Sequence, residues 1–137
     1  MKLLLSGILF FTIGLNINQA QQTPEIKIST FTEIPEDLRN AMGDCGTGYY
    51  YLSKADKKNE KLICVTEDDI VLIYINNKPV KFKSKGTMYV SGKYSLTIKD
   101  GPPKNIGDET WTMKSFIMLK YENKIIWSKD LIGYGGC

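Results

Sequence analysis

Beyond residue 48 the chain is dominated by short stretches in which apolar and polar side chains alternate, separated by glycine, asparagine and acidic residues. Alternation with a period of two is typical of β-strands that bury one face. Residues Ile70–Ile75 depart from this pattern because every one of them is apolar or aromatic. Such a run is typical of a central strand that is buried on both faces. Turn signals at intervals of about ten residues predict several short antiparallel strands.

The clearest local signal is the pair Asn76-Asn77, which connects this central strand to the alternating stretch Lys78–Lys83. Asparagine tolerates the positive φ angles that a two-residue hairpin turn requires. In the second strand Val80 and Phe82 share one face, and lysines occupy the other. Because Pro79 has no backbone N–H to donate, we expect it at a sheet edge, near the start of its strand or at a bulge.

The last third of the chain predicts two more strands after an irregular segment. Residues 100–108 include two prolines and two glycines and are expected to form a loop without regular structure. Glu109–Tyr121 follows as a long strand. Lys124–Lys129 is predicted to be a further strand, with Ile125 and Trp127 on one face.

One short helix is predicted, from Pro35 to Met42. Proline suits the first helical position, acidic residues in the first turn favour the helix dipole, and Gly43 ends the helix. The charged run Lys54–Lys61 is expected to be a solvated loop. Together the elements predict an all-β fold. It is an antiparallel meander that closes as a small barrel of about eight strands, with one short helix near the N-terminus.

Residues 1–20 are expected to be a signal peptide that is cleaved and is not part of the fold. Lys2 precedes the apolar stretch Leu3–Leu15, and a polar stretch ending at Ala20 follows, which is the order of a secretory signal. The apolar stretch is too short to span a membrane, which takes about 20 residues. Residues 21–137 are then expected to form a single domain that is exported, periplasmic or secreted, and that has no membrane span.

Composition excludes several classes of function. Removing residues 1–20 takes away Lys2 and lowers the net charge from +3 to +2, whereas nucleic-acid binders carry a strong basic excess. The chain has no histidine, which is the usual general base and the commonest zinc ligand. The spacing of the three cysteines matches no short metal-ligand pattern. We therefore predict a protein that is not an enzyme, holds no cofactor or metal, and does not bind nucleic acid.

Carboxylate pairs are the remaining route to acid–base chemistry, as in glycoside hydrolysis. The candidates are Glu67, Asp68 and Asp69, or Asp108 and Glu109. Both groups fall in predicted turns, where acidic residues are usually solvated or bind nearby backbone groups. An enzyme is therefore the last of the hypotheses that the sequence supports.

Two other patterns allow either a binding role or a structural one. Lys81, Lys83 and Lys85 could form an anion-binding face, although lysines on an edge strand also discourage strand-to-strand aggregation. The run Tyr49–Tyr51 supplies rigid contact area for a partner. On a strand, however, Tyr50 points away from the face of its two neighbours, so at least one face of this strand belongs to the core.

Export implies an oxidising compartment, so the three cysteines predict one disulfide with one sulfur left over. Cys64 lies within the strand-like run 62–65, where burial explains its presence. The pairing of Cys45, Cys64 and Cys137 stays open at this point.

From residue 34 to residue 137 the order of features resembles an uncharacterised family of small exported bacterial β-barrel proteins. The resemblance is carried by Ile34-Pro35-Glu36, by the hairpin Ile75-Asn76-Asn77-Lys78 and by the terminal Gly133-Tyr134-Gly135-Gly136-Cys137. Members often carry Cys-x-Cys before an aromatic strand and Cys-Gly-Cys at the end. This chain lacks one cysteine of each motif, which implies loss of one bridge and retention of Cys45–Cys137. Burial of Cys64 favours this long bridge over a Cys45–Cys64 pair.

A second stretch, Ser91-Gly92-Lys93-Tyr94, is followed by Trp111 in the next long strand. It resembles the inhibitory Ser-Gly-x-x-Tyr-like loop of periplasmic inhibitors of C-type lysozyme, which are small β-barrels. The Trp-Ser-Lys-Gly element of that family has a partial counterpart in Trp127-Ser128-Lys129, later in the chain. The resemblance implies that Ser91, Gly92, Lys93 and Tyr94 contact a protein partner, a hydrolase of a host or a competitor.

The sequence therefore favours an exported, non-catalytic binding module, either an inhibitor or an envelope-protecting protein. It would present the loops around Gly92 and residues 100–108, because rigid β scaffolds commonly carry binding groups on loops. The alternative is a small barrel that carries an apolar ligand in its interior.

Overall fold

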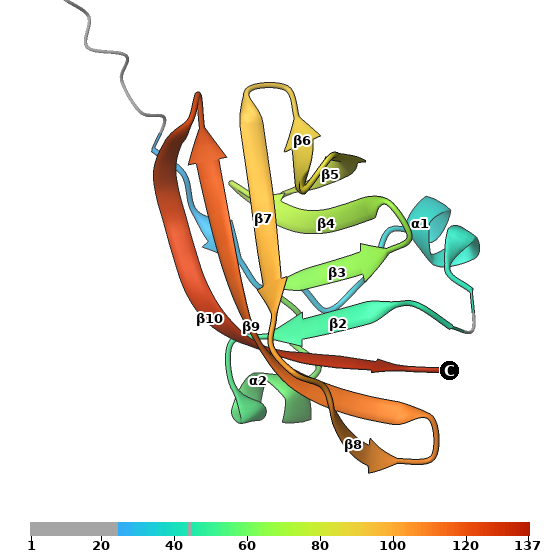
Figure 1. Cartoon of the computed structure of the whole chain (residues 1–137). Helices are drawn as coiled ribbons and strands as arrows, with labels where there is room; N and C mark the ends of the chain where they lie inside the picture. The colour runs from blue at the N-terminus through green and yellow to red at the C-terminus, as the bar shows by residue number, and fades with distance from the viewer. Residues whose placement is uncertain (1–24, 44) are drawn as a thin grey trace, which may run out of the picture.

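A computed structural model describes residues 25–43 and 45–137, and in this part of the chain ten strands and two short helices are present (Figure 1). The predicted signal peptide, residues 1–20, lies outside the described residues. No helix among the described residues is long and apolar enough to cross a membrane. In chain order the elements are β1 Ile28–Ser29, α1 Glu36–Ala41, β2 Gly48–Tyr51, α2 Lys54–Lys58, β3 Cys64–Glu67, β4 Ile70–Ile75, β5 Lys78–Lys85, β6 Met88–Ser91, β7 Tyr94–Asp100, β8 Lys104–Gly107, β9 Thr110–Tyr121 and β10 Lys124–Gly136.

Eight of the strands in the described part close into an antiparallel barrel, as the sequence predicts. Their order around the barrel is β4-β3-β2-β10-β9-β7-β6-β5, and β5 pairs with β4 to complete the ring. Within this ring the last barrel strand of the chain, β10, pairs with the first, β2. The two strands are antiparallel, with Tyr134 opposite Tyr49. The two remaining strands lie outside the ring, β1 on β4 and β8 on β9.

Two hairpin turns are built from residues that tolerate positive φ. Asn76 and Asn77 have φ of 51° and 63°, which confirms the predicted two-residue turn between β4 and β5. Glu122 and Asn123 make the same kind of turn between β9 and β10, with φ of 47° and 67°. Pro79 is the second residue of β5, so the expectation that it lies near the start of its strand is confirmed.

Strand β4 is buried on both faces, as its continuous apolar sequence predicts. Val71, Ile73 and Ile75 belong to the cluster that fills the barrel, while Leu72 belongs to a second cluster on the outer wall. The cluster in the barrel consists of Tyr50, Ile63, Cys64, Val71, Ile73, Ile75, Phe82, Leu96, Ile117, Leu119 and Leu131. The outer cluster consists of Phe31, Leu38, Leu62, Val65 and Leu72. The segment with β1 and helix α1 therefore covers one side of the barrel, which is why this wall needs two apolar faces.

Helix α1 confirms the predicted helix near the N-terminus, with Pro35 at its N-cap and Glu36 and Asp37 in its first turn. The prediction of a loop over 54–61 is wrong, because Lys54–Lys58 forms helix α2. The Ser53 side chain caps α2 by accepting a hydrogen bond from the Asp56 N–H at 3.1 Å. Lys57 extends from the last turn to the Tyr134 ring, 4.3 Å from its centroid. The N-cap and this cation–π contact stabilise a helix in a segment whose high charge favours a solvated loop.

The prediction of a structureless segment over 100–108 is also wrong, because it contains β8. Strand β7 accompanies β9 only as far as the pair Asp100–Ser115. The first residues of β9 then continue beyond β7 with an edge available for hydrogen bonding. Strand β8 occupies that edge, with Lys104 opposite Thr112. A long neighbouring strand, rather than local propensity, orders this segment.

A β-bulge changes the faces of β10 near its start. The pairing with β9 shifts register between Ile125 and Trp127. Ile126 and Trp127 consequently both pack against the barrel core, whereas Ile125 is 56% exposed. The prediction that Ile125 and Trp127 share a face is therefore wrong, because the extra residue of a bulge reverses the alternation.

Glu67 is the last residue of β3 and is only 5% exposed, so its assignment to a solvated turn is wrong. Its carboxylate accepts hydrogen bonds from the Thr47 hydroxyl and, at 3.2 Å, from the Gly43 N–H. Both donors belong to the segment that leads into β2. Glu67 therefore holds this segment against the barrel, which is a structural role for a buried acid.

Replacing Glu67 by glutamine is expected to lower the free energy of unfolding by about 1–3 kcal/mol, because the new NH₂ group faces a donor. Urea unfolding followed by circular dichroism measures the difference. Asp68→Asn is the matched control, because Asp68 is exposed in the adjoining turn and asparagine tolerates its φ of 48°. Equal stability of the two variants would contradict a structural role for Glu67.

Candidate functional site

The residues predicted to contact a partner form the tight turn between β6 and β7. Ser91 ends β6 and pairs with Tyr94 at the start of β7, so Gly92 and Lys93 are the two turn residues. Gly92 has a φ of 55°, in the left-handed region that favours glycine. Gly92 and Lys93 are exposed, while Ser91 and Tyr94 are half-buried. The sequence motif therefore occupies a projecting point on the rim of the barrel (Figure 1).

A shallow, open cleft of about 440 Å³ lies beside this turn, lined by Val80, Ser91, Gly92, Lys93, Tyr94 and Tyr121. Its origin is the short pairing between β5 and β6, which covers only Lys83–Lys85 of β5. The first half of β5 therefore continues past the end of β6 without a neighbour on that side. Val80 lies in this half of β5, on the far side of the cleft from the turn. The cleft was not predicted, because it depends on how far two strands extend past each other.

The turn is fixed to the neighbouring β9–β10 turn by polar contacts. The Glu122 backbone N–H donates a hydrogen bond to the Lys93 carbonyl oxygen at 3.0 Å. The Lys93 ammonium also lies 3.1 Å from the Glu122 carboxylate. This hydrogen-bonded pair raises the pKa of Lys93, so the ammonium stays charged at neutral pH.

Aromatic packing supports the same turn from inside the barrel. The rings of Tyr94 and Tyr121 meet edge to face, with centroids 5.1 Å apart. Tyr94 also contacts Phe82, whose ring is in the fully buried core, at a centroid separation of 6.5 Å. The tyrosines thus anchor the exposed turn to the core and form one wall of the cleft.

Comparison of the chain with protein-family models, with curated proteins and with solved structures found no match.

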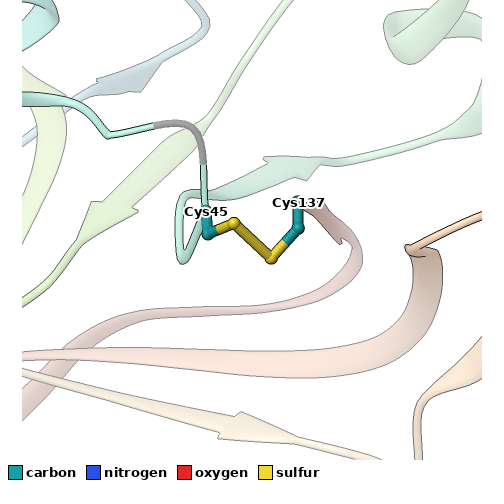
Figure 2. Close-up of a disulfide and its surroundings, with 2 residues drawn as sticks. All are labelled: Cys45 and Cys137. Carbon is teal, nitrogen blue, oxygen red and sulfur yellow. A yellow bond between two sulfur atoms is a disulfide. The ribbon is translucent and has the colours of Figure 1, made fainter.

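A disulfide joins Cys45 to Cys137, as the sequence predicts (Figure 2). It connects the segment before β2 to the residue after β10 and lies next to the seam where the barrel closes. Cys64 is buried and keeps its thiol, whose pKa is raised by burial. A buried, protonated thiol is chemically inert, so the predicted structural role of Cys64 is in keeping with its surroundings.

The lysine row and the tyrosine run do not form a site with the turn. Lys81 is paired with Asp37 of helix α1, while Lys83 and Lys85 remain exposed on the outer face of β5. Tyr50 points into the barrel and is 3% exposed, which confirms that one face of β2 is core. Tyr49 and Tyr51 pack against the outer cluster and are half-buried.

The acidic residues considered for catalysis lie either in a buried structural contact or in exposed turns, and Asp68 and Asp69 form the exposed turn between β3 and β4. Glu67 is buried and holds Gly43 and Thr47, as described above. Asp108 and Glu109 are exposed at the turn between β8 and β9. Within residues 25–43 and 45–137, no cluster of three or more cysteine or acidic side chains has a geometry that could hold a metal ion.

Proposed function

We propose that this protein is an exported, non-catalytic binding module that uses the β6–β7 turn to bind a hydrolase of a host or a competitor. The observation that carries the proposal is the position of Ser91-Gly92-Lys93-Tyr94. These four residues resemble the inhibitory loop of C-type lysozyme inhibitors, and they form an exposed turn beside a cleft. A projecting turn of this kind suits insertion into the concave site of an enzyme.

The chemistry of the turn suits a glycan-cleaving partner in particular. Such enzymes carry a pair of carboxylates at the scissile bond. The Lys93 ammonium is a complementary charge, and its side chain is 66% exposed. Its present partner, Glu122, is a surface carboxylate, and exposed ion pairs of this type contribute little. Exchange of Glu122 for a partner's carboxylate therefore costs little free energy.

Rigidity of the turn also supports binding. The hydrogen bond to Glu122 and the packing of Tyr94 hold the backbone before any partner arrives. A segment that is already ordered loses less conformational entropy on binding, so more of the contact energy appears as affinity. The disulfide supports the proposed export, because such bonds persist in oxidising compartments.

An apolar ligand inside the barrel is not proposed. The middle of the barrel is occupied by side chains with no exposed surface, among them Phe82, Leu96 and Leu119. A ligand there would have to displace well-packed side chains.

Binding of the purified protein to a C-type lysozyme, measured by biolayer interferometry together with inhibition of cell-wall hydrolysis, tests the proposal. Lys93→Glu is expected to weaken binding by at least about tenfold, because it places a like charge opposite the enzyme's carboxylates. The matched control is Lys61→Glu, an exposed lysine whose backbone N–H donates to the Asp56 carbonyl oxygen of helix α2. Figure 1 shows α2 at the opposite end of the barrel from the β6–β7 turn. The control is expected to bind like the unaltered protein.

Two outcomes would overturn the proposal. One is the absence of binding to glycan hydrolases at any accessible concentration. The other is an equal loss of affinity in Lys93→Glu and Lys61→Glu, which would show a general charge effect instead of recognition by the turn.

A further inference from the structure

A second cavity, of about 170 Å³, lies at the other end of β7 from the turn. Its walls come from β2, β3, β7, β9 and β10, and the lining side chains with useful chemistry are Tyr50, Thr66, Asp100, Trp111 and Met113. The cleft at the β6–β7 turn and this cavity share no residue. It is therefore a separate candidate site.

Asp100 presents a carboxylate that is held from one side by hydroxyl groups. The Ser115 hydroxyl donates to Oδ1 at 2.7 Å, and the Tyr50 hydroxyl lies within donating distance of both oxygens, 3.1 Å from Oδ1 and 3.3 Å from Oδ2. Burial, together with the charge of Asp100, raises the pKa of Tyr50, so this phenol remains a hydrogen-bond donor. Oδ2 shares only the Tyr50 donor, and because each carboxylate oxygen can accept two hydrogen bonds, it keeps acceptor capacity for a ligand.

The aromatic walls of the cavity depend on glycines in β10. A Cβ atom on Gly135 would lie 2.7 Å from Nε1 of Trp111, and one on Gly133 would lie 3.0 Å from Cε1 of Tyr50. These contacts show that both rings lie directly against the β10 backbone. Two glycines in one strand thus let an indole and a phenol line the cavity close to a carboxylate.

The charge and polarisability of the lining select for a cation. Among the described residues that line the cavity, Asp100 is the one charged side chain. Aromatic faces carry partial negative charge and attract cations, and a thioether such as that of Met113 is soft and polarisable. A divalent metal ion needs several oxygen ligands, which one carboxylate does not supply. Asp100 is solvent-exposed, and a cation gains a charge pairing with its carboxylate that a neutral ligand does not.

From this arrangement we propose that the cavity binds a small organic cation through its ammonium group. The ammonium would lie against Oδ2 of Asp100, with Trp111 and Tyr50 beside its alkyl substituents. Recognition of alkylated ammonium groups by aromatic side chains and a carboxylate follows from cation–π attraction and charge pairing.

The disulfide connects two walls of this cavity. Gly46, directly after Cys45, lines one wall, and Gly135, two residues before Cys137, lines another. Figure 2 shows how the bridge spans the two chain segments. The bridge therefore borders the cavity.

Titration of the protein with tetramethylammonium chloride, followed by NMR, tests the site. The indole N–H signal of Trp111 is expected to shift saturably, while that of Trp127 does not. The neutral molecule tert-butyl alcohol and an equal concentration of sodium chloride are the ligand controls.

Asp100→Asn is expected to weaken binding by at least about tenfold, because the amide keeps the acceptor for Tyr50 and Ser115 but loses the charge. Asp108→Asn, in the exposed β8–β9 turn, is the matched control and is expected to bind normally.

A measurement on the unaltered protein keeps the test independent of how the variant folds. The carboxylate carbon of Asp100 is expected to shift along the same binding curve as the Trp111 indole. The proposal fails if tert-butyl alcohol or sodium chloride produces the same saturable shift as tetramethylammonium. It also fails if folded Asp100→Asn binds as well as the unaltered protein, or if neither Trp111 nor Asp100 responds to the cation.

Discussion

Replacing both Cys45 and Cys137 by serine is expected to lower the free energy of unfolding by about 4–5 kcal/mol. The bridge spans 92 residues, almost the whole described domain. A cross-link of this length removes many conformations from the unfolded chain, which is the main source of its stabilising effect. Because both residues are exposed, the serine hydroxyls meet solvent and add no burial penalty of their own.

The folded state contributes little to this loss, because other contacts hold the same strands. The Cys137 N–H donates to the Glu109 carbonyl oxygen at 2.9 Å, and β10 remains paired with β2 from Ile132 to Tyr134. Equilibrium urea unfolding followed by circular dichroism measures the change. The reduced, unaltered protein is the matched control, and it should resemble the double variant. A difference of less than about 1 kcal/mol between oxidised and reduced protein would contradict this expectation.

Phe82→Ala is expected to destabilise the protein by about 3–5 kcal/mol, which is the cost of removing a fully buried ring from a packed core. Phe82 has no exposed surface, and it lies in β5 opposite Val71 of β4. Phe82 belongs to the cluster that fills the barrel, and the other members of this cluster are themselves buried and packed, so they cannot collapse far into the space that the ring leaves. When the surroundings of a cavity cannot relax, the loss of stability lies at the upper end of this range.

The matched control for Phe82→Ala is Ile106→Ala in β8, where the side chain is 52% exposed. This change is expected to stay within about 0.5 kcal/mol, as is usual for surface positions. Phe82→Leu should fall between the two because it keeps part of the buried volume. Urea unfolding of the three variants measures the series. Similar stabilities for Phe82→Ala and Ile106→Ala would show that the barrel interior is not the main core.

The sequence by itself predicted the features that depend on neighbouring residues. Continuous apolar character identified β4, and the paired asparagines identified the turn to β5. Proline and acidic residues identified helix α1. Each of these signals acts within a few residues, so no knowledge of the rest of the chain is needed to interpret it. The pairing of Cys45 with Cys137 came from resemblance to other proteins and from the strand position of Cys64.

For the candidate sites, the sequence predicted individual residues but not their surroundings. The motif at Ser91–Tyr94 was recognisable, yet the cleft beside it requires Val80 and Tyr121 from other strands. The contact between Tyr50 and Asp100 joins residues 50 positions apart and left no local signal. The sequence shows glycines near the C-terminus, but it does not show that the Trp111 and Tyr50 rings pack against their backbone.

Tertiary structure alone decided the elements for which local pattern was ambiguous or misleading. Strand β8 exists because β9 extends past β7, and the bulge after Ile125 follows from the register with β9. Glu67 is buried because the segment before β2 supplies two donors to its carboxylate. In each case the free energy comes from a partner distant in sequence, which the local pattern does not encode.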